Sequence, residues 1–251
     1  MTTSGTTVFT VTNTDIIAAA LRKLGVIGAG DSASTEDTTN CLFALNTILK
    51  SLAIKGYLLW CYQNASNTLA SGTASYDIGP VNGVGTFNVA RPLRIAQAWI
   101  QDANGVRTPL MELARADYYR LSLASQVGIP TNWYYDPKVL ASSTATALPN
   151  VGTIYTWPVI NQTGYTLYIS YQRPIQDIGA GTQNFDLPQE WFQPLVYLLA
   201  ADVAPEYSVN LQKISMLMAR AERYLEEVSD FSREEASVYF TVDPQMGNHG
   251  L

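Results

Sequence analysis

The histidine, cysteine and carboxylate side chains of this sequence are the ones that could take part in catalysis or bind a metal, but they form no recognisable catalytic site. His249 is the sole histidine and has glycine beside it, whereas a general base must be held rigidly beside its nucleophile. Zinc sites need several cysteine or histidine ligands at close spacing, and the sequence contains no such group. The glycine-rich stretches 28–30 and 79–85 lack the lysine of a phosphate loop. We therefore predict no catalytic residue, no metal site and no cofactor.

Carboxylate pairs leave one enzymatic alternative open, because a glycosidase needs only two acids in a cleft. Glu206, Glu222, Glu226 and Glu227 are candidates by residue type alone. The three on the last predicted helix lie on its polar side, which is typical of a solvated surface. A hydrolase that uses two of these acids, such as Glu206 and Glu222, stays an alternative.

The two cysteines are predicted to be small buried thiols. Cys41 falls on the apolar face of a predicted helix, and Cys61 directly follows Trp60. The pattern is not that of a disulfide-stapled secreted domain, although a bond between the two remains open. No signal peptide is visible in Met1 to Thr14, so we expect the chain to fold in a reducing cytoplasm.

Composition argues against nucleic-acid readers and membrane spans. The formal charge is −6, the isoelectric point is near 4.7, and lysines and arginines do not cluster. No apolar run approaches the roughly 20 residues that a membrane span needs. The 15 tyrosines, 7 phenylalanines and 5 tryptophans suit a packed core and also subunit interfaces, where aromatics are enriched.

Two helices are predicted near the start of the sequence. Thr12 and Asp15 have the spacing of a capping box, and Gly25 supplies the stop of the first helix. The second helix is predicted from Ser34 to Gly56. Its apolar positions recur at helical spacing, at Cys41, Leu42, Leu45, Ile48, Leu49 and Leu52.

Short strands are predicted between about Asn64 and Arg173. Residues 93–100 and 166–171 are the clearest strands, and the dipeptides at 71–72, 82–83 and 104–105 are typical turns. One short helix is predicted at 115–123. Several strands at regular spacing indicate a small sandwich or barrel.

Helices are predicted to return after residue 186. Pro188 suits a first helical position, Pro194 would kink the next helix or mark its start, and Pro205 would end or bend it. A last helix is predicted from Ser208 to Asp230. Its apolar stripe is Leu211, Ile214, Leu217, Ala221, Leu225 and Val228.

The predicted fold class is α+β, with an N- and C-terminal helical bundle that is split by an inserted antiparallel β-rich domain. We place the helical core at 1–63 and 186–231, the β-rich insertion at 64–185, and an extended C-terminal arm at 232–251. The arm is polar apart from Tyr239 and Phe240, so it reads either as a frayed end or as a segment that orders on a partner.

Several short motifs are each too weak to identify a family, but their order along the chain is more specific. The stretches are Ala70 to Tyr76, Arg91 to Ile95, Gly128 to Pro130, Tyr165 to Ile169, Leu187 to Trp191, Leu195 to Ala200 and Ala204 to Tyr207. Together, over about Thr12 to Asp230, they resemble the head-to-tail adaptors of short-tailed bacteriophages, also called tail accessory factors or packaged-DNA stabilisation proteins.

This resemblance implies a structural virion protein of the neck, assembled in the host bacterial cytoplasm. It implies a ring of twelve copies beneath the portal protein that extends the DNA channel toward the tail nozzle or tail tube protein. Genome DNA would pass without sequence-specific binding, and no membrane would be involved. A phage peptidoglycan hydrolase, and another tail or fibre binding module, remain alternatives.

Two groups of site residues follow as expectations. By position, the arm implies portal contacts at Ser232, Arg233, Tyr239, Phe240, Val242, Pro244 and Met246. The polar side of the last helix is a guess for the channel wall, with Lys213, Arg220, Glu222 and Glu226.

Overall fold

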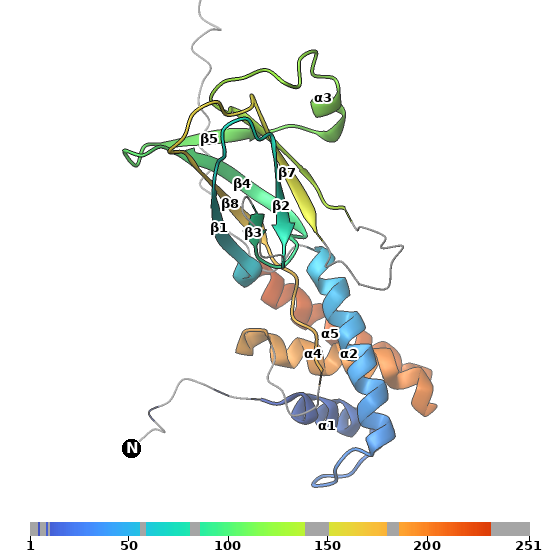
Figure 1. Cartoon of the computed structure of the whole chain (residues 1–251). Coiled ribbons are helices and arrows are strands. Elements are labelled where there is room, and N and C mark those ends of the chain that lie inside the picture. Colours follow the sequence, from blue (N-terminus) through green and yellow to red (C-terminus); the bar gives the residue numbers. More distant parts are fainter. Residues whose placement is uncertain are drawn as a thin grey trace, which may run out of the picture.

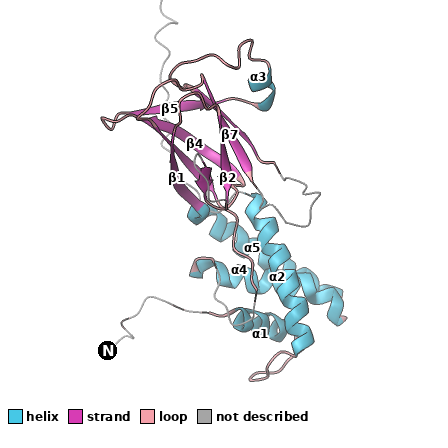
Figure 2. Cartoon of the chain, in the orientation of Figure 1, coloured by secondary structure: helices cyan, strands magenta, loops and turns pink. Residues whose placement is uncertain are grey.

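The computed structural model describes residues 5, 9, 11–55, 59–80, 86–138, 151–179 and 186–231. The long helices gather at one end of the molecule, and the strands with one short helix lie at the other (Figures 1 and 2). The chain leaves the helices, builds the sheet and then returns to the helices. The predicted combination of helices and strands is confirmed.

The first two helices start at the predicted caps. In α1 (Asn13–Leu24) the Thr12 hydroxyl accepts from the Asp15 amide at 3.3 Å, and the Asp15 carboxylate accepts from the Thr12 amide at 2.9 Å. Gly25 ends α1 in the left-handed region, with φ 77°. At the start of α2 (Thr35–Lys55) the Ser34 hydroxyl accepts from the Asp37 amide at 3.1 Å. The predicted stop at Gly56 lies outside the described residues.

The returning helices are divided more finely than predicted. A 3-10 turn, η2 (Gln189–Trp191), follows Pro188, and α4 (Phe192–Val203) then carries Pro194 in its first turn, where a missing amide costs little. A second 3-10 turn, η3 (Ala204–Tyr207), contains Pro205 and separates α4 from α5 (Leu211–Phe231).

One hydrophobic core is shared by α1, α2, α4 and α5. Buried residues of α1, α2 and α4 dominate it, including Ile17, Leu21, Leu45, Leu49, Leu195 and Leu199, and α5 adds Leu217 and Ala221. The predicted placement of Leu211 on the core-facing stripe is wrong, because its side chain is 80% exposed. It lies about 100° around the helix from the Leu217–Ala221 face. Ile175 and Ile178, which follow the last strand, also pack in this core.

Eight strands form one sheet that almost closes on itself. They are β1 (Tyr62–Thr68), β2 (Ser75–Gly79), β3 (Thr86–Asn88), β4 (Arg94–Gln101), β5 (Arg107–Glu112), β6 (Asn132–Asp136), β7 (Gly152–Trp157) and β8 (Thr166–Gln172). Their order is β1-β8-β4-β5-β6-β7-β2-β3, and the end strands β1 and β3 contact one another. A second hydrophobic core lies within the sheet, around Tyr76, Phe87, Trp133, Ile154 and Leu167.

The predicted antiparallel pairing holds for most strand pairs of the insertion but not for all of them. The pairs β2–β3 and β5–β6 are parallel, and the others are antiparallel. Parallel neighbours need a crossover, and residues 113–131 between β5 and β6 are long enough to supply one. The predicted short helix lies in this crossover, but α3 (Arg115–Tyr119) stops four residues earlier than expected.

Both cysteines are buried and free of a disulfide, as expected for small core thiols. Cys41 lies in α2, and Cys61 ends the 3-10 turn η1 (Leu59–Cys61) that leads into β1. Burial raises the pKa of each thiol to about 11. Both therefore stay protonated and unreactive at neutral pH.

Candidate assembly surfaces

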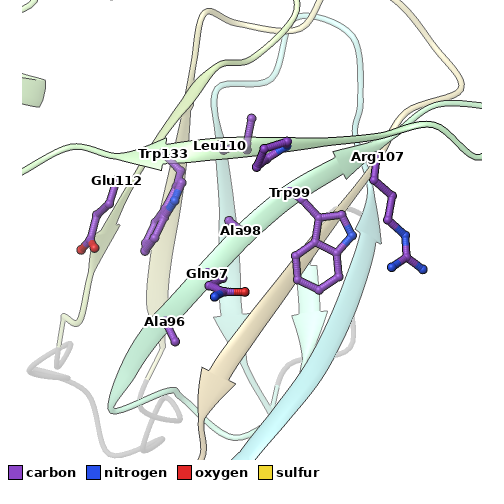
Figure 3. Close-up of a pocket in the computed structure, with 9 residues that line it drawn as sticks. Ala96, Gln97, Ala98, Trp99, Arg107, Leu110, Glu112 and Trp133 are labelled. Atoms are coloured by element: carbon purple, nitrogen blue, oxygen red, sulfur yellow. The ribbon is translucent and has the colours of Figure 1, made fainter. Parts of the chain in front are cut away.

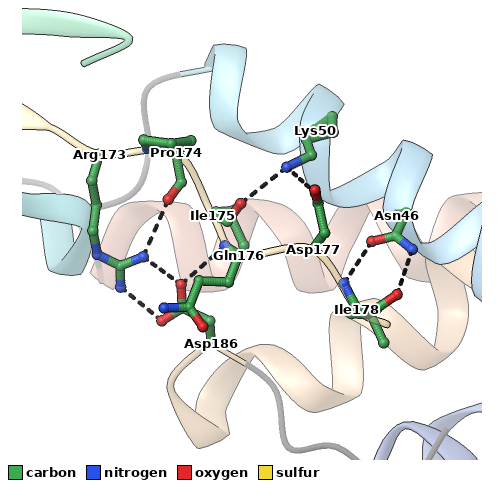
Figure 4. Close-up of polar contacts among 9 residues, drawn as sticks. All are labelled: Asn46, Lys50, Arg173, Pro174, Ile175, Gln176, Asp177, Ile178 and Asp186. Carbon is green, nitrogen blue, oxygen red and sulfur yellow. Dashed lines mark hydrogen bonds and ion pairs between the residues drawn. The ribbon is translucent and has the colours of Figure 1, made fainter. Parts of the chain in front are cut away.

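Polar contacts fasten the segment that follows β8 onto α2 (Figure 4). The Asn46 side-chain amide accepts from the Ile178 amide at 2.9 Å and donates to the Ile178 carbonyl at 3.0 Å. The Lys50 ammonium donates to the Ile175 carbonyl at 3.0 Å and forms an ion pair with Asp177. An otherwise irregular backbone segment is thereby fixed along a helix.

An arginine–carboxylate pair closes the same joint. Arg173 donates through both terminal nitrogens to the carboxylate of Asp186, and one of these hydrogen bonds measures 2.7 Å. The side chains are only 16% and 22% exposed. The Gln176 amide also donates to Asp186 at 3.2 Å. The pair thus joins the exit from the sheet to the start of the returning helices.

The ion pair with Arg173 affects the pKa of Asp186. Burial alone raises the pKa of the carboxyl, but the hydrogen bonds from Arg173 and from the Gln176 amide together hold it below its usual value. A carboxyl whose pKa is lowered by folding stabilises the folded state above its unfolded pKa, about 3.9. That contribution is lost as the pH falls through the lower folded pKa.

Replacing Asp186 by Ala is expected to lower the free energy of unfolding by about 2 kcal/mol at pH 7, since it leaves the half-buried Arg173 unpaired. Urea unfolding at a series of pH values measures the effect. The difference from wild type should shrink below about pH 3.9, as Asp186 becomes protonated. Asp177→Ala is the matched control, because its ion pair with Lys50 is exposed and should contribute less than about 0.5 kcal/mol. Equal losses in the two variants would contradict the assignment.

The four channel residues guessed on α5 do not share one side of the helix. Lys213 donates to the Leu24 carbonyl at 2.9 Å, and Arg220 donates to the Tyr197 hydroxyl at 3.3 Å. Both therefore turn toward neighbouring helices. Glu222 and Glu226 are exposed, and Glu222 lies about 200° around the helix from Arg220. Lys213 and Arg220 therefore lie on one side of α5, and Glu222 and Glu226 lie on another.

The other sequence-based candidates are dispersed. Glu206 lines a groove beside Asp202, whereas Glu222 lies on the exposed side of α5. The expected portal-binding residues and His249 lie outside the described residues; they are Ser232, Arg233, Tyr239, Phe240, Val242, Pro244 and Met246.

A cluster of tyrosines joins α3 to β6 and β7. Helix α3 lies at the end of the sheet far from the helical core (Figure 1). The rings of Tyr118, Tyr134 and Tyr155 lie 5.2 to 5.8 Å apart, centroid to centroid. Lys138 lies over Tyr155 and forms an ion pair with the buried Asp136 at 3.4 Å. Stacked rings with a polar rim are typical of interface anchors.

Exposed apolar side chains also occur in the part of the chain around α3. They occupy the end of β5, α3 and the crossover to β6, at Met111, Tyr119, Leu123, Val127 and Ile129. Met111, for example, is 72% exposed. Several such side chains within one crossover indicate a surface that is covered by another protein.

A groove of about 570 Å³ opens on the sheet where β5 leaves β4 to pair with β6 (Figure 3). Pairing between β4 and β5 begins at Ala98, and β5 pairs with β6 from Met111. Glu112 and Trp133 lie toward one end of the groove, and Trp99 and Arg107 toward the other. Aromatic surfaces flanked by opposite charges suit contact with a protein segment.

Within the described ranges, no group of three or more histidine, cysteine or acidic side chains could hold a metal ion. Across the same part of the chain, no helix is both long and apolar enough to cross a membrane.

The family model described as SU10 adaptor protein matches residues 11–244, which span both hydrophobic cores and most of the predicted arm. No curated protein matches the chain.

Proposed function

Because the chain belongs to the SU10 adaptor protein family, we propose that it is a head-to-tail adaptor, a structural protein of the bacteriophage neck. The family match over residues 11–244 is the observation that carries this proposal. The buried, protonated thiols and the dispersed carboxylates agree with a structural rather than a catalytic role.

The proposed assembly is a ring of twelve copies beneath the portal protein. The ring extends the channel for genome DNA and carries the tail nozzle or tail tube protein. A net charge of −6 on each copy supports passage of DNA rather than retention, because phosphates are repelled. Assembly would take place in the host bacterial cytoplasm.

Each part of the chain has a proposed place in this ring. The helical core, 1–63 and 186–231, forms the ring body, the insertion 64–185 faces the tail, and the arm 232–251 reaches the portal. The exposed apolar residues of α3 and the neighbouring crossover support the tail-facing role, because α3 lies at the end of the sheet far from the helical core (Figure 1). The joint at Arg173 and Asp186 supports a rigid link between the two parts.

Electron microscopy of the protein mixed with its portal protein tests the proposal. An added ring of density on one end of the portal is the expected result, with the helical core toward the portal. Portal particles that remain unchanged at saturating concentrations of this protein would overturn the proposal.

A further inference from the structure

The helical core carries two faces of opposite charge, on different sides of α4. This helix contacts α1, α2 and α5 and is buried along most of its length. Tyr197 and Asp202, five residues apart, point about 140° away from one another around its axis. Tyr197 belongs to a basic face, and Asp202 belongs to an acidic groove.

The acidic groove lies between α2 and the end of α4, with a volume of about 530 Å³. Its lining combines Asp202 and Glu206 with Phe43, whose side chain is 77% exposed. Phe43 is turned away from the core face of α2, which carries Cys41 and Leu45. An exposed phenylalanine that shares a groove with two carboxylates suits a partner that is both apolar and basic.

The basic face lies where α5 meets the end of α1. The Lys23 ammonium lies 5.3 Å from the centre of the Tyr197 ring, and the Arg220 guanidinium lies 6.0 Å from it. The hydrogen bond from Arg220, with the nearby charge of Lys23, lowers the pKa of Tyr197. Met216, 46% exposed, lies one helical turn from Arg220 and supplies the apolar part.

The cations of this face are not neutralised by carboxylates. Among the described residues, none of Lys23, Lys213 and Arg220 forms an ion pair, although acidic residues outnumber basic ones in the chain by 21 to 15. Their partners are instead the Leu24 carbonyl and the Tyr197 ring. Positive charge is therefore concentrated on one side of an otherwise acidic core.

We propose that the acidic groove of one copy binds the basic face of a second copy. Phe43 packs against Met216 of the neighbour, while Asp202 and Glu206 lie opposite Lys23 and Arg220. A contact between two different faces is heterologous, so its repetition generates a ring when the rotation closes. The inference rests on the proposed adaptor ring and identifies the surfaces that would join its subunits.

A second copy fits these faces better in this arrangement than in a two-fold dimer. A two-fold axis through the groove would set Asp202 and Glu206 against the same carboxylates, and one through the basic face would set cations against cations. Like charges across an interface are destabilising. Only the contact between unlike faces sets carboxylates against cations.

Reciprocal charge reversal tests this arrangement. Glu206→Arg sets a cation of the groove against the cations of the neighbour's basic face, and Arg220→Glu sets a carboxylate of the basic face against the carboxylates of the groove. Each variant alone should therefore lose self-association by about tenfold or more. A mixture of the two variants, or the double variant, restores unlike faces and should recover it. Arg94→Glu, an exposed reversal in β4 outside every candidate assembly surface, is the control that should leave self-association unchanged.

Cross-linking with a short bis-maleimide gives a readout that detects weak contacts. Thr47→Cys marks the groove and Met216→Cys marks the basic face, while Cys41 and Cys61 are buried. The variant with both new cysteines should give a ladder of oligomers, and a mixture of the two single variants should stop at dimers. Homodimers from either single variant, no cross-linking at all, or no recovery in the charge-swapped mixture would overturn the inference. A ladder together with failure to bind the portal would instead overturn the proposed function alone.

Discussion

Removing residues 232–251 is expected to abolish capture of this protein by its portal protein while leaving the folded protein intact. The segment is polar around a single aromatic pair, Tyr239 and Phe240, which suits a segment that orders on a partner. Every residue of the two described hydrophobic cores precedes it. A pull-down on immobilised portal measures the loss, and urea unfolding checks that stability is unchanged.

The matched control replaces residues 232–251 with a glycine–serine segment of equal length. If the sequence of the arm carries the binding, this control should fail as completely as the deletion. Tyr239→Ala with Phe240→Ala should weaken capture at least tenfold, because truncated interface aromatics commonly cost about 2 kcal/mol or more. Full portal binding by the deletion variant would contradict the role of the arm and would leave the adaptor ring itself to be tested by microscopy.

Local signals in the sequence were sufficient to predict the helices. The capping box of Thr12 and Asp15, the Ser34–Asp37 start and the Gly25 stop all lie within a few residues of the helix end that they define. Such signals act through backbone groups of the adjoining turn, so they do not depend on the rest of the fold. The apolar spacing of α2 was informative for the same reason, and Cys41 and Leu45 are buried.

The joint between sheet and helices could not be predicted in this way. Asn46 contacts Ile178 and Lys50 contacts Ile175, across sequence separations of more than a hundred residues. No local pattern marks a side chain that binds the backbone of a distant segment. The parallel pair β5–β6 was missed because pairing depends on where the crossover places a strand, and alternation within the strand does not record this.

The polar side of α5 shows why charge alone is a weak guide to a surface. Lys213 and Arg220 read as solvated from their type, but their partners are the end of α1 and the Tyr197 ring. Phe43 shows the opposite case. An apolar residue in a helix is usually assigned to the core, but the side chain of Phe43 is exposed. The two faces proposed to join subunits could not be recognised from the sequence, because they depend on how α4 places Tyr197 and Asp202 on different sides of the helical core.

Replacing Trp191 by Ala is expected to lower the free energy of unfolding by about 3–5 kcal/mol, a large share of the roughly 5–15 kcal/mol typical of a folded protein. Trp191 is buried where the chain returns from the sheet, and its ring packs edge-on against Trp60, 5.0 Å away between centroids. Trp60 precedes β1, so the pair also ties the start of the sheet to the returning helices. Urea unfolding followed by circular dichroism measures the loss.

Trp99→Ala is the matched control for Trp191→Ala. Trp99 is only half-buried and stacks on Tyr168 at the outer side of the sheet, so its removal should cost less than about 2 kcal/mol. Equal losses in the two variants would show that Trp191 does not hold the two parts together. If the assignment is right, Trp191→Ala should also weaken addition of the ring to the portal, because the arm and the tail-facing sheet depend on one helical core for their relative positions.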